Sequence, residues 1–123
     1  MLSSSLEPVL RDIRSSGAPV PEIRDDDRAD DPGFASAMLW SRDGSGAGVS
    51  VDLTAPDHAR VMQLADQVQE WVIEELWGHA PTNWPPCPNH PEGHPLAAST
   101  REARAVWVCP RDETPFSPVG SLK

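Results

Sequence analysis

Proline is concentrated in the last third of this 123-residue chain, and it limits what that third can fold into. Nine of the fourteen prolines lie within residues 81–123, and five of them fall in the stretch WPPCPNHPEGHPLA, from Trp84 to Ala97. Proline has no backbone N–H and a nearly fixed φ, so a regular ladder of backbone hydrogen bonds cannot hold this stretch together. We therefore expect it to form neither helix nor strand, and to be held by its side chains or by a bound group.

The same stretch carries side chains that bind metal ions well. In Cys87-Pro88-Asn89-His90, two residues separate a thiol from an imidazole, a spacing at which a tight turn points both at one ion. The order recurs in Cys109-Pro110-Arg111-Asp112, where a carboxylate takes the place of the imidazole. Bonds to a metal ion would order a segment that lacks backbone hydrogen bonds. The alternative is that both cysteines are simply buried and that the prolines stiffen a surface loop.

Strands are expected on either side of the second turn, at Ala105–Cys109 and Val119–Leu122. With two Cys-Pro turns and strands on either side of the second, residues 84–123 resemble a zinc ribbon, a family in which two such turns clamp one Zn²⁺. The resemblance implies a structural zinc ion. The family normally has Cys-x-x-Cys turns, whereas this chain has His90 and Asp112 where the second cysteine of each turn would be. The arrangement also looks like that of small bacterial or phage proteins, a likeness that implies no function.

The sequence offers five candidate ligands for four positions on the ion. Cys87, His90 and Cys109 belong to every arrangement, and His94 and Asp112 compete for the last position. The symmetry of the two turns favours Asp112, whereas structural zinc sites are built mostly from Cys and His, which favours His94. We predict a zinc site of Cys87, His90, His94 and Cys109. Asp112 is the alternative fourth ligand, or it accepts a hydrogen bond from a ligand imidazole.

The first half of the chain has clearer signals of secondary structure. Apolar residues spaced as on one helical face predict a short helix over Leu6–Ile13. The aspartate-rich stretch Arg24–Gly33 predicts a solvated loop. Two runs of strand-forming residues within Ala35–Leu53 flank the turn signal Asp43-Gly44-Ser45-Gly46, which predicts a β-hairpin.

A long amphipathic helix is expected after the hairpin. Thr54 and Asp57 have the spacing of a capping box at its start, and Gly78 fits the position just past its end. Apolar residues recur along one face, and the other face is expected to meet water. The apolar stripe comprises Val61, Leu64, Ala65, Val68, Trp71, Val72 and Leu76, widened by Met62, Ile73 and Trp77, and the polar face comprises Arg60, Gln63, Asp66, Gln67, Gln69, Glu70 and Glu74.

These expectations define an α+β fold, in which a β-hairpin packs on one long amphipathic helix and a zinc-ribbon-like β segment follows. Residues 1–23 form a short helix and turn, 24–34 an acidic flexible loop, 35–80 the hairpin and long helix, and 81–123 the proline-rich segment. Loss of a metal ligand is expected to unfold residues 84–123, while the hairpin and the long helix stay largely intact.

Acidic residues dominate the first two thirds of a chain whose net charge is −9. Acidic and basic residues number 8 and 4 over residues 1–35, 7 and 2 over 36–80, and 4 and 4 over 81–123. Such a surface repels phosphate backbones, which argues against nucleic-acid binding and favours another protein as the partner. The sequence lacks the pattern of a secretory signal, and no stretch approaches the roughly 18 apolar residues of a membrane span. We therefore expect a cytoplasmic protein.

Two functions fit these features. The first is a non-enzymatic binding or adaptor module whose zinc ion is structural. The second is a metal-dependent hydrolase or deaminase with an open zinc site, which needs a free position for water and a general base nearby. Because the Cys-x-x-Cys pair of the nucleobase deaminases is absent from the chain, we favour the binding module.

Overall fold

A computed structural model of the chain describes residues 2–25, 33–41, 44–76 and 83–122. Within these residues the fold is mixed α/β, with two helices and three small antiparallel sheets. Neither helix of this described part is long and apolar enough to cross a membrane. In chain order the elements are α1 (Leu2–Ser16), β1 (Glu22–Asp25), β2 (Phe34–Trp40), β3 (Gly46–Asp52), α2 (Asp57–Leu76), β4 (Pro86–Cys87), β5 (His90–Pro95), β6 (Ala97–Arg101), β7 (Arg104–Val108) and β8 (Pro115–Pro118).

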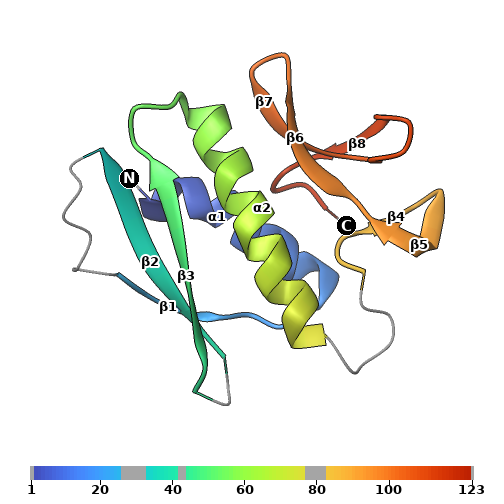
Figure 1. Ribbon diagram of the computed structural model, residues 1–123. Helices are drawn as coiled ribbons and strands as arrows, with labels where there is room; N and C mark the ends of the chain where they lie inside the picture. The colour runs from blue at the N-terminus through green and yellow to red at the C-terminus, as the bar shows by residue number, and fades with distance from the viewer. Residues whose placement is uncertain (1, 26–32, 42–43, 77–82, 123) are drawn as a thin grey trace.

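Helix α2 lies between the two halves of the molecule (Figure 1). The sheet β1-β2-β3 contacts one side of α2 through β3, and the sheet β6-β7-β8 contacts the helix through β6 and β7. Helix α1 also packs on α2, and the two-stranded sheet β4-β5 lies on the same side of α2 as β6-β7-β8 (Figure 1). Buried side chains from both sides form one continuous hydrophobic core, so the two halves share their interior.

The structure contains the predicted hairpin and both predicted helices. Strands β2 and β3 pair antiparallel, and Val49 and Val51 of β3 are buried, as the alternation of residues predicts. Helix α1 includes the expected Leu6–Ile13 and is longer at both ends. Most of the predicted stripe of α2 is buried, comprising Val61, Leu64, Ala65, Val68, Trp71 and Val72.

The start of α2 differs from the prediction. Its first helical hydrogen bond runs from the Arg60 N–H to the Pro56 carbonyl, at 3.0 Å, so Pro56 is the residue that precedes the helix. Thr54 does not cap the helix, because its hydroxyl and its N–H both donate to the carboxylate of Asp52, at 2.6 and 2.9 Å. The capping-box prediction was therefore wrong. Gly78, the predicted end signal, lies outside the described residues.

The first sheet contains a strand that the sequence does not predict. Strand β1 pairs antiparallel with β2, with Glu22 opposite Trp40 and Asp25 opposite Ala37. Nearby prolines and aspartates favour a loop here, and pairing with a neighbouring strand overrides that weak local preference. Residues 24 and 25 therefore belong to a strand, and residues 26–32 of the predicted acidic loop lie outside the described residues.

The proline-rich stretch forms strands, contrary to expectation. Strands β4 and β5 pair with each other, and the chain continues directly into β6. A two-stranded sheet consists of edge strands, and prolines fit where the backbone nitrogen faces away from the partner strand. Pro86 and Pro95 stand opposite each other in this pairing. The prediction of neither helix nor strand was wrong because it did not consider edge strands.

The end of the chain is held by a carboxylate. The last strand of the described residues is β8, not the expected Val119–Leu122. The Val119 N–H still donates to the Ala105 carbonyl of β7, at 3.0 Å, but the residues after it turn away to α1. Asp12 of α1 is fully buried, and its Oδ2 accepts hydrogen bonds from the Trp107 indole N–H at 2.8 Å and the Gly120 N–H at 2.7 Å. Its Oδ1 accepts a third bond from the Leu122 N–H at 2.9 Å. One side chain thus ties α1 to β7 and to the C-terminal segment.

We predict that Asp12→Ala lowers the free energy of unfolding by about 3 kcal/mol or more, because it leaves two buried N–H groups and one partly buried N–H group without an acceptor. Urea unfolding of the full chain measures the change. The control is Asp66→Ala on the exposed face of α2, which should stay within about 0.5 kcal/mol of the wild type. Equal effects of the two substitutions would contradict the role given to Asp12.

Candidate metal centre

Two turns bring the candidate ligands together. Cys87 ends β4 and His90 begins β5, and the two residues pair across the turn of Pro88 and Asn89. Cys109 follows β7, where a second turn is closed by bonds from the Cys109 N–H to the Thr114 carbonyl at 2.9 Å and from the Glu113 N–H to the Cys109 carbonyl at 2.7 Å. The first turn therefore orients two candidate ligands, and the second orients one.

The four side chains Cys87, His90, His94 and Cys109 converge on one point. Their ligand atoms all lie within 4.8 Å of one another. The Nδ1 of His90 is 3.6 Å from the Cys87 sulfur and 3.8 Å from the Cys109 sulfur, and the Nε2 of His94 is 3.9 Å from the Cys109 sulfur. A tetrahedral ion with bonds of about 2.3 Å to sulfur and about 2.0 Å to nitrogen holds these atoms about 3.6 Å apart. The three sulfur–nitrogen separations are close to this value, and the four ligand atoms are near enough together to surround one ion.

A neighbouring carbonyl selects the tautomer of the neutral His94 ring. Its Nδ1 lies 3.0 Å from the carbonyl oxygen of Pro95, so that nitrogen carries the proton and donates it. The Nε2, which faces the thiols, then has a free lone pair. An outer hydrogen bond of this kind orients a ligand imidazole and makes it a better electron donor. His90 instead presents Nδ1, and the two rings lie 4.9 Å apart between centroids.

The two thiols are fully buried. Burial raises the pKa of the Cys109 thiol, and the backbone N–H groups of Asp112 and Arg111, which point at its sulfur, act in the opposite direction. The adjacent Cys87 sulfur also raises this pKa. Two thiolates side by side in a buried position require a compensating positive charge, which a divalent metal ion supplies.

Asp112, the alternative fourth ligand, is not part of this group. Its exposed carboxylate accepts a hydrogen bond from the Thr114 N–H at 3.0 Å. Hydrogen bonds from the hydroxyl and N–H of Thr114 hold the pKa of Asp112 below its ordinary value, with smaller effects of the Cys109 thiol and of His90. The acceptor found for a ligand imidazole is the Pro95 carbonyl. The structure therefore groups His94, and not Asp112, with the other three residues.

Sequence reasoning missed a residue that closes the ligand-bearing loop. Gln69 of α2 was expected to face water, but it is buried, and its Nε2 donates to the carbonyls of Trp84 and Leu96. The Leu96 N–H also donates to the Pro85 carbonyl at 2.7 Å. These bonds join both ends of the loop that carries three of the candidate ligands. The signal was present, because Gln69 lies four residues after the buried Ala65 and so falls on the apolar face.

Cys87, His90, His94 and Cys109 are placed to hold a metal ion. Two sulfur and two nitrogen donors make a complete tetrahedral set. No family model, curated protein or solved structure matches the chain, so the chemistry of the site follows from its own geometry.

We predict that His94→Ala loses metal and that Asp112→Ala keeps it. Loss of an outer hydrogen-bond partner typically weakens metal binding about 10–100-fold, so loss of a ligand should weaken it further. Competition with a chromophoric chelator gives the affinity of each purified variant. If Asp112→Ala releases the metal and His94→Ala retains it, the geometric assignment is wrong.

Proposed function

We propose that this chain is a small zinc-binding protein in which the zinc ion is structural. The observation that carries the proposal is that the ligand atoms of two buried thiols and two imidazoles all lie within 4.8 Å of one another. A tetrahedral set of two sulfurs and two nitrogens is typical of zinc. Two thiolates also neutralise the charge of a divalent ion, so the site as a whole is neutral and suits a buried position.

A structural role is favoured over a catalytic one by the number of ligands. A catalytic zinc ion keeps one position for water, whereas four protein side chains fill all the tetrahedral positions here. The competing function, a metal-dependent hydrolase or deaminase, would require one of these ligands to leave. His94 is held by Pro95 and both thiols are buried, which supports a closed site.

The resemblance to a zinc ribbon supports the same proposal in part. Two tight turns, one after β4 and one after β7, each begin with a cysteine, and in that family two such turns clamp the zinc ion. The geometry departs from the family pattern at the second turn, where the further ligand is His94 of β5 and not a residue of the turn itself. The site would need reduced thiols, which fits a location in the cytoplasm.

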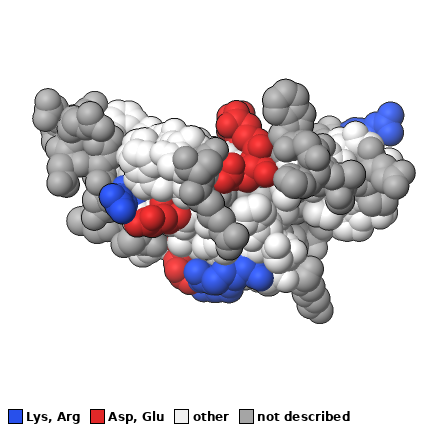
Figure 2. All heavy atoms as spheres, turned by 90° about the horizontal axis from the view of Figure 1, so that it is seen from below, with Lys and Arg blue, Asp and Glu red and all other residues white. Residues whose placement is uncertain are grey.

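We further propose a binding or adaptor role with a protein partner. Asp66, Glu70 and Glu74 are exposed on α2 and spaced four apart, so they form an acidic stripe. On the face seen in Figure 2, the described Arg side chains form small separate groups, some of them beside acidic ones, and no continuous basic stripe of described residues crosses it. A surface of this kind suits a basic protein patch better than a phosphate backbone.

We predict one zinc ion per chain when the protein is prepared without a metal-chelating tag, and none in Cys87→Ser or Cys109→Ser. Elemental analysis measures the content. Substitution with Co²⁺ should give the absorption of a tetrahedral ion with thiolate ligands. The control is Ser45→Ala, which changes a hydroxyl far along the sequence from the four ligands. Unchanged metal content in both cysteine variants would end the zinc proposal, and a rapidly exchanging water on the bound ion would favour the enzymatic alternative.

A further inference from the structure

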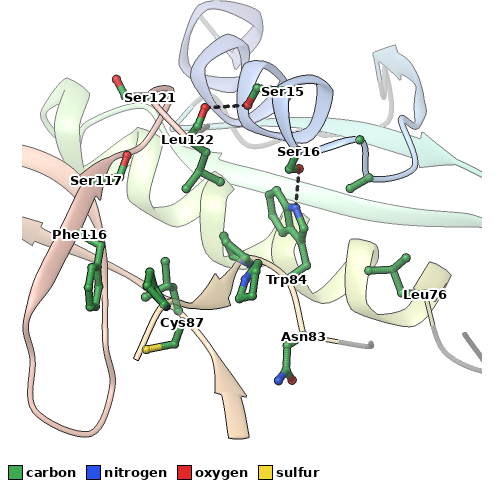
Figure 3. A pocket seen from close by; sticks show the side chains of 16 residues that line it. Ser15, Ser16, Leu76, Asn83, Trp84, Cys87, Phe116, Ser117, Ser121 and Leu122 are labelled. Carbon is green, nitrogen blue, oxygen red and sulfur yellow. Dashed lines mark hydrogen bonds between the residues drawn. The ribbon is translucent and has the colours of Figure 1, made fainter. Parts of the chain in front are cut away.

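A pocket of about 840 Å³ lies beside the first ligand-bearing turn (Figure 3). The ends of α1 and α2, the segment before β4, strand β8 and the C-terminal residues all contribute to its lining. Cys87 lines the pocket together with Pro86 and Pro88, so one wall is the backbone that also presents a candidate metal ligand. The pocket and the metal centre therefore share a structural element.

The floor of the pocket is fixed and its walls are partly open. Trp84 and Leu96 are almost fully buried, and the Trp84 indole N–H donates to the Ser16 hydroxyl at 2.9 Å, as Figure 3 shows. The Trp84 ring also packs edge-to-face on Trp107, with 5.6 Å between centroids. Around this floor, the apolar side chains of Leu76, Phe116 and Leu122 are only partly buried. A partner thus meets a preformed apolar surface.

The lining carries no Asp, Glu, His, Lys or Arg among the described residues, although the chain has a net charge of −9. Ligand pockets in proteins typically measure about 300–1,000 Å³ and are lined mostly by apolar groups, and this pocket falls in that range. Its few polar groups are serine hydroxyls and Asn83. The lining chemistry therefore selects an apolar occupant.

A second cavity of about 670 Å³ adjoins the first and adds one charge. The two cavities share Gly17, Ala18 and Leu76, and the second also includes Glu75. In the part of the chain that the structure describes, Glu75 forms no ion pair. A cationic group that lies next to the apolar pocket would therefore meet an unpaired carboxylate.

The structure does not favour a partner peptide that binds as an extra strand at the edge of the sheet beside the pocket. Strand β8 is the edge of its sheet and borders the pocket, but it begins and ends with Pro115 and Pro118, which have no N–H to offer. Recognition must therefore use side chains in the pocket.

We propose that the pocket binds a short segment of a partner protein that combines large apolar side chains with an adjacent Lys or Arg. The apolar side chains fill the space above Trp84, and the basic one pairs with Glu75. This inference deepens the proposed function and rests on it in one respect, because zinc would hold the pocket wall at Cys87 in place. Bound zinc would then raise the affinity of the protein for the peptide, and bound peptide would raise its affinity for zinc.

Selection of short random peptides on the zinc-loaded full chain tests the proposal. Enriched peptides should carry apolar residues beside Lys or Arg, and their affinity should fall as salt rises. Leu76→Lys puts a cation into the pocket wall, at a helix C-terminus that tolerates it, and should weaken binding at least about tenfold. Its control is Phe34→Lys, which makes the same kind of change at an exposed apolar residue of β2 outside both cavities and should leave binding unchanged.

A closely matched pair tests the charge. Glu75→Gln should weaken peptide binding about two- to fivefold, whereas Glu74→Gln removes the same charge one residue away, outside both cavities, and should have no effect. The proposal would be overturned if no peptides were enriched or if the enriched peptides were acidic. It would also be overturned if Leu76→Lys and Phe34→Lys bound the peptides equally well, or if the protein formed a dimer that Leu76→Lys dissociates. Elemental analysis of the same samples gives their zinc content and so separates the claim of zinc binding from the claim of peptide binding. If the expected peptides bind protein that contains no zinc, the proposed zinc function and its coupling to the pocket are wrong, but the peptide site is not.

Discussion

The structure depends on how the proline-rich half of the chain compensates for its missing backbone donors. Proline removes N–H groups from strands β4, β5 and β8, so their ladders are short and irregular. Three sets of side chains hold this half instead. Asp12 binds the C-terminal residues and Trp107, Gln69 closes the ligand-bearing loop, and the Cys2His2 group joins the two turns. Without these, little beyond the shared core would fix the strands.

These side chains also link the metal centre to the rest of the molecule. Helix α2 supplies Gln69 to the base of the loop, and α1 supplies Asp12 to the residues that follow β8. Trp107, fully buried, donates to Asp12 and packs edge-to-face on Trp84, so it joins β7 to α1 and to the segment before β4. A zinc ion would therefore act on a segment that the core already positions, which is the arrangement expected of a structural metal. The apolar pocket lies where these same segments meet, so its shape would depend on the metal as well.

Local signals predicted the elements whose contacts are local. The hairpin, the two helices and the pairing of Cys87 with His90 across a tight turn follow from spacing and turn residues. The choice of His94 over Asp112 rested on ligand chemistry alone, because the geometry that decides it depends on the course of β5 past the second turn. Asp12 was missed since its bond to Gly120 spans 108 residues, and no local pattern reports such a contact. The place of Gln69 on the apolar face of the helix did signal its burial, but its partner Leu96 lies 27 residues away and could not be predicted. The strands with prolines were missed because only their edge positions make proline acceptable.

Amide hydrogen exchange of the full chain, with zinc and after its removal by a chelator, tests most directly whether metal binding orders the proline-rich half. The account predicts that removal lowers protection most in β4, β5 and the residues around Cys109, while β2, β3 and the first turns of α2 keep most of theirs. Protection that is the same in every strand with and without zinc would contradict it.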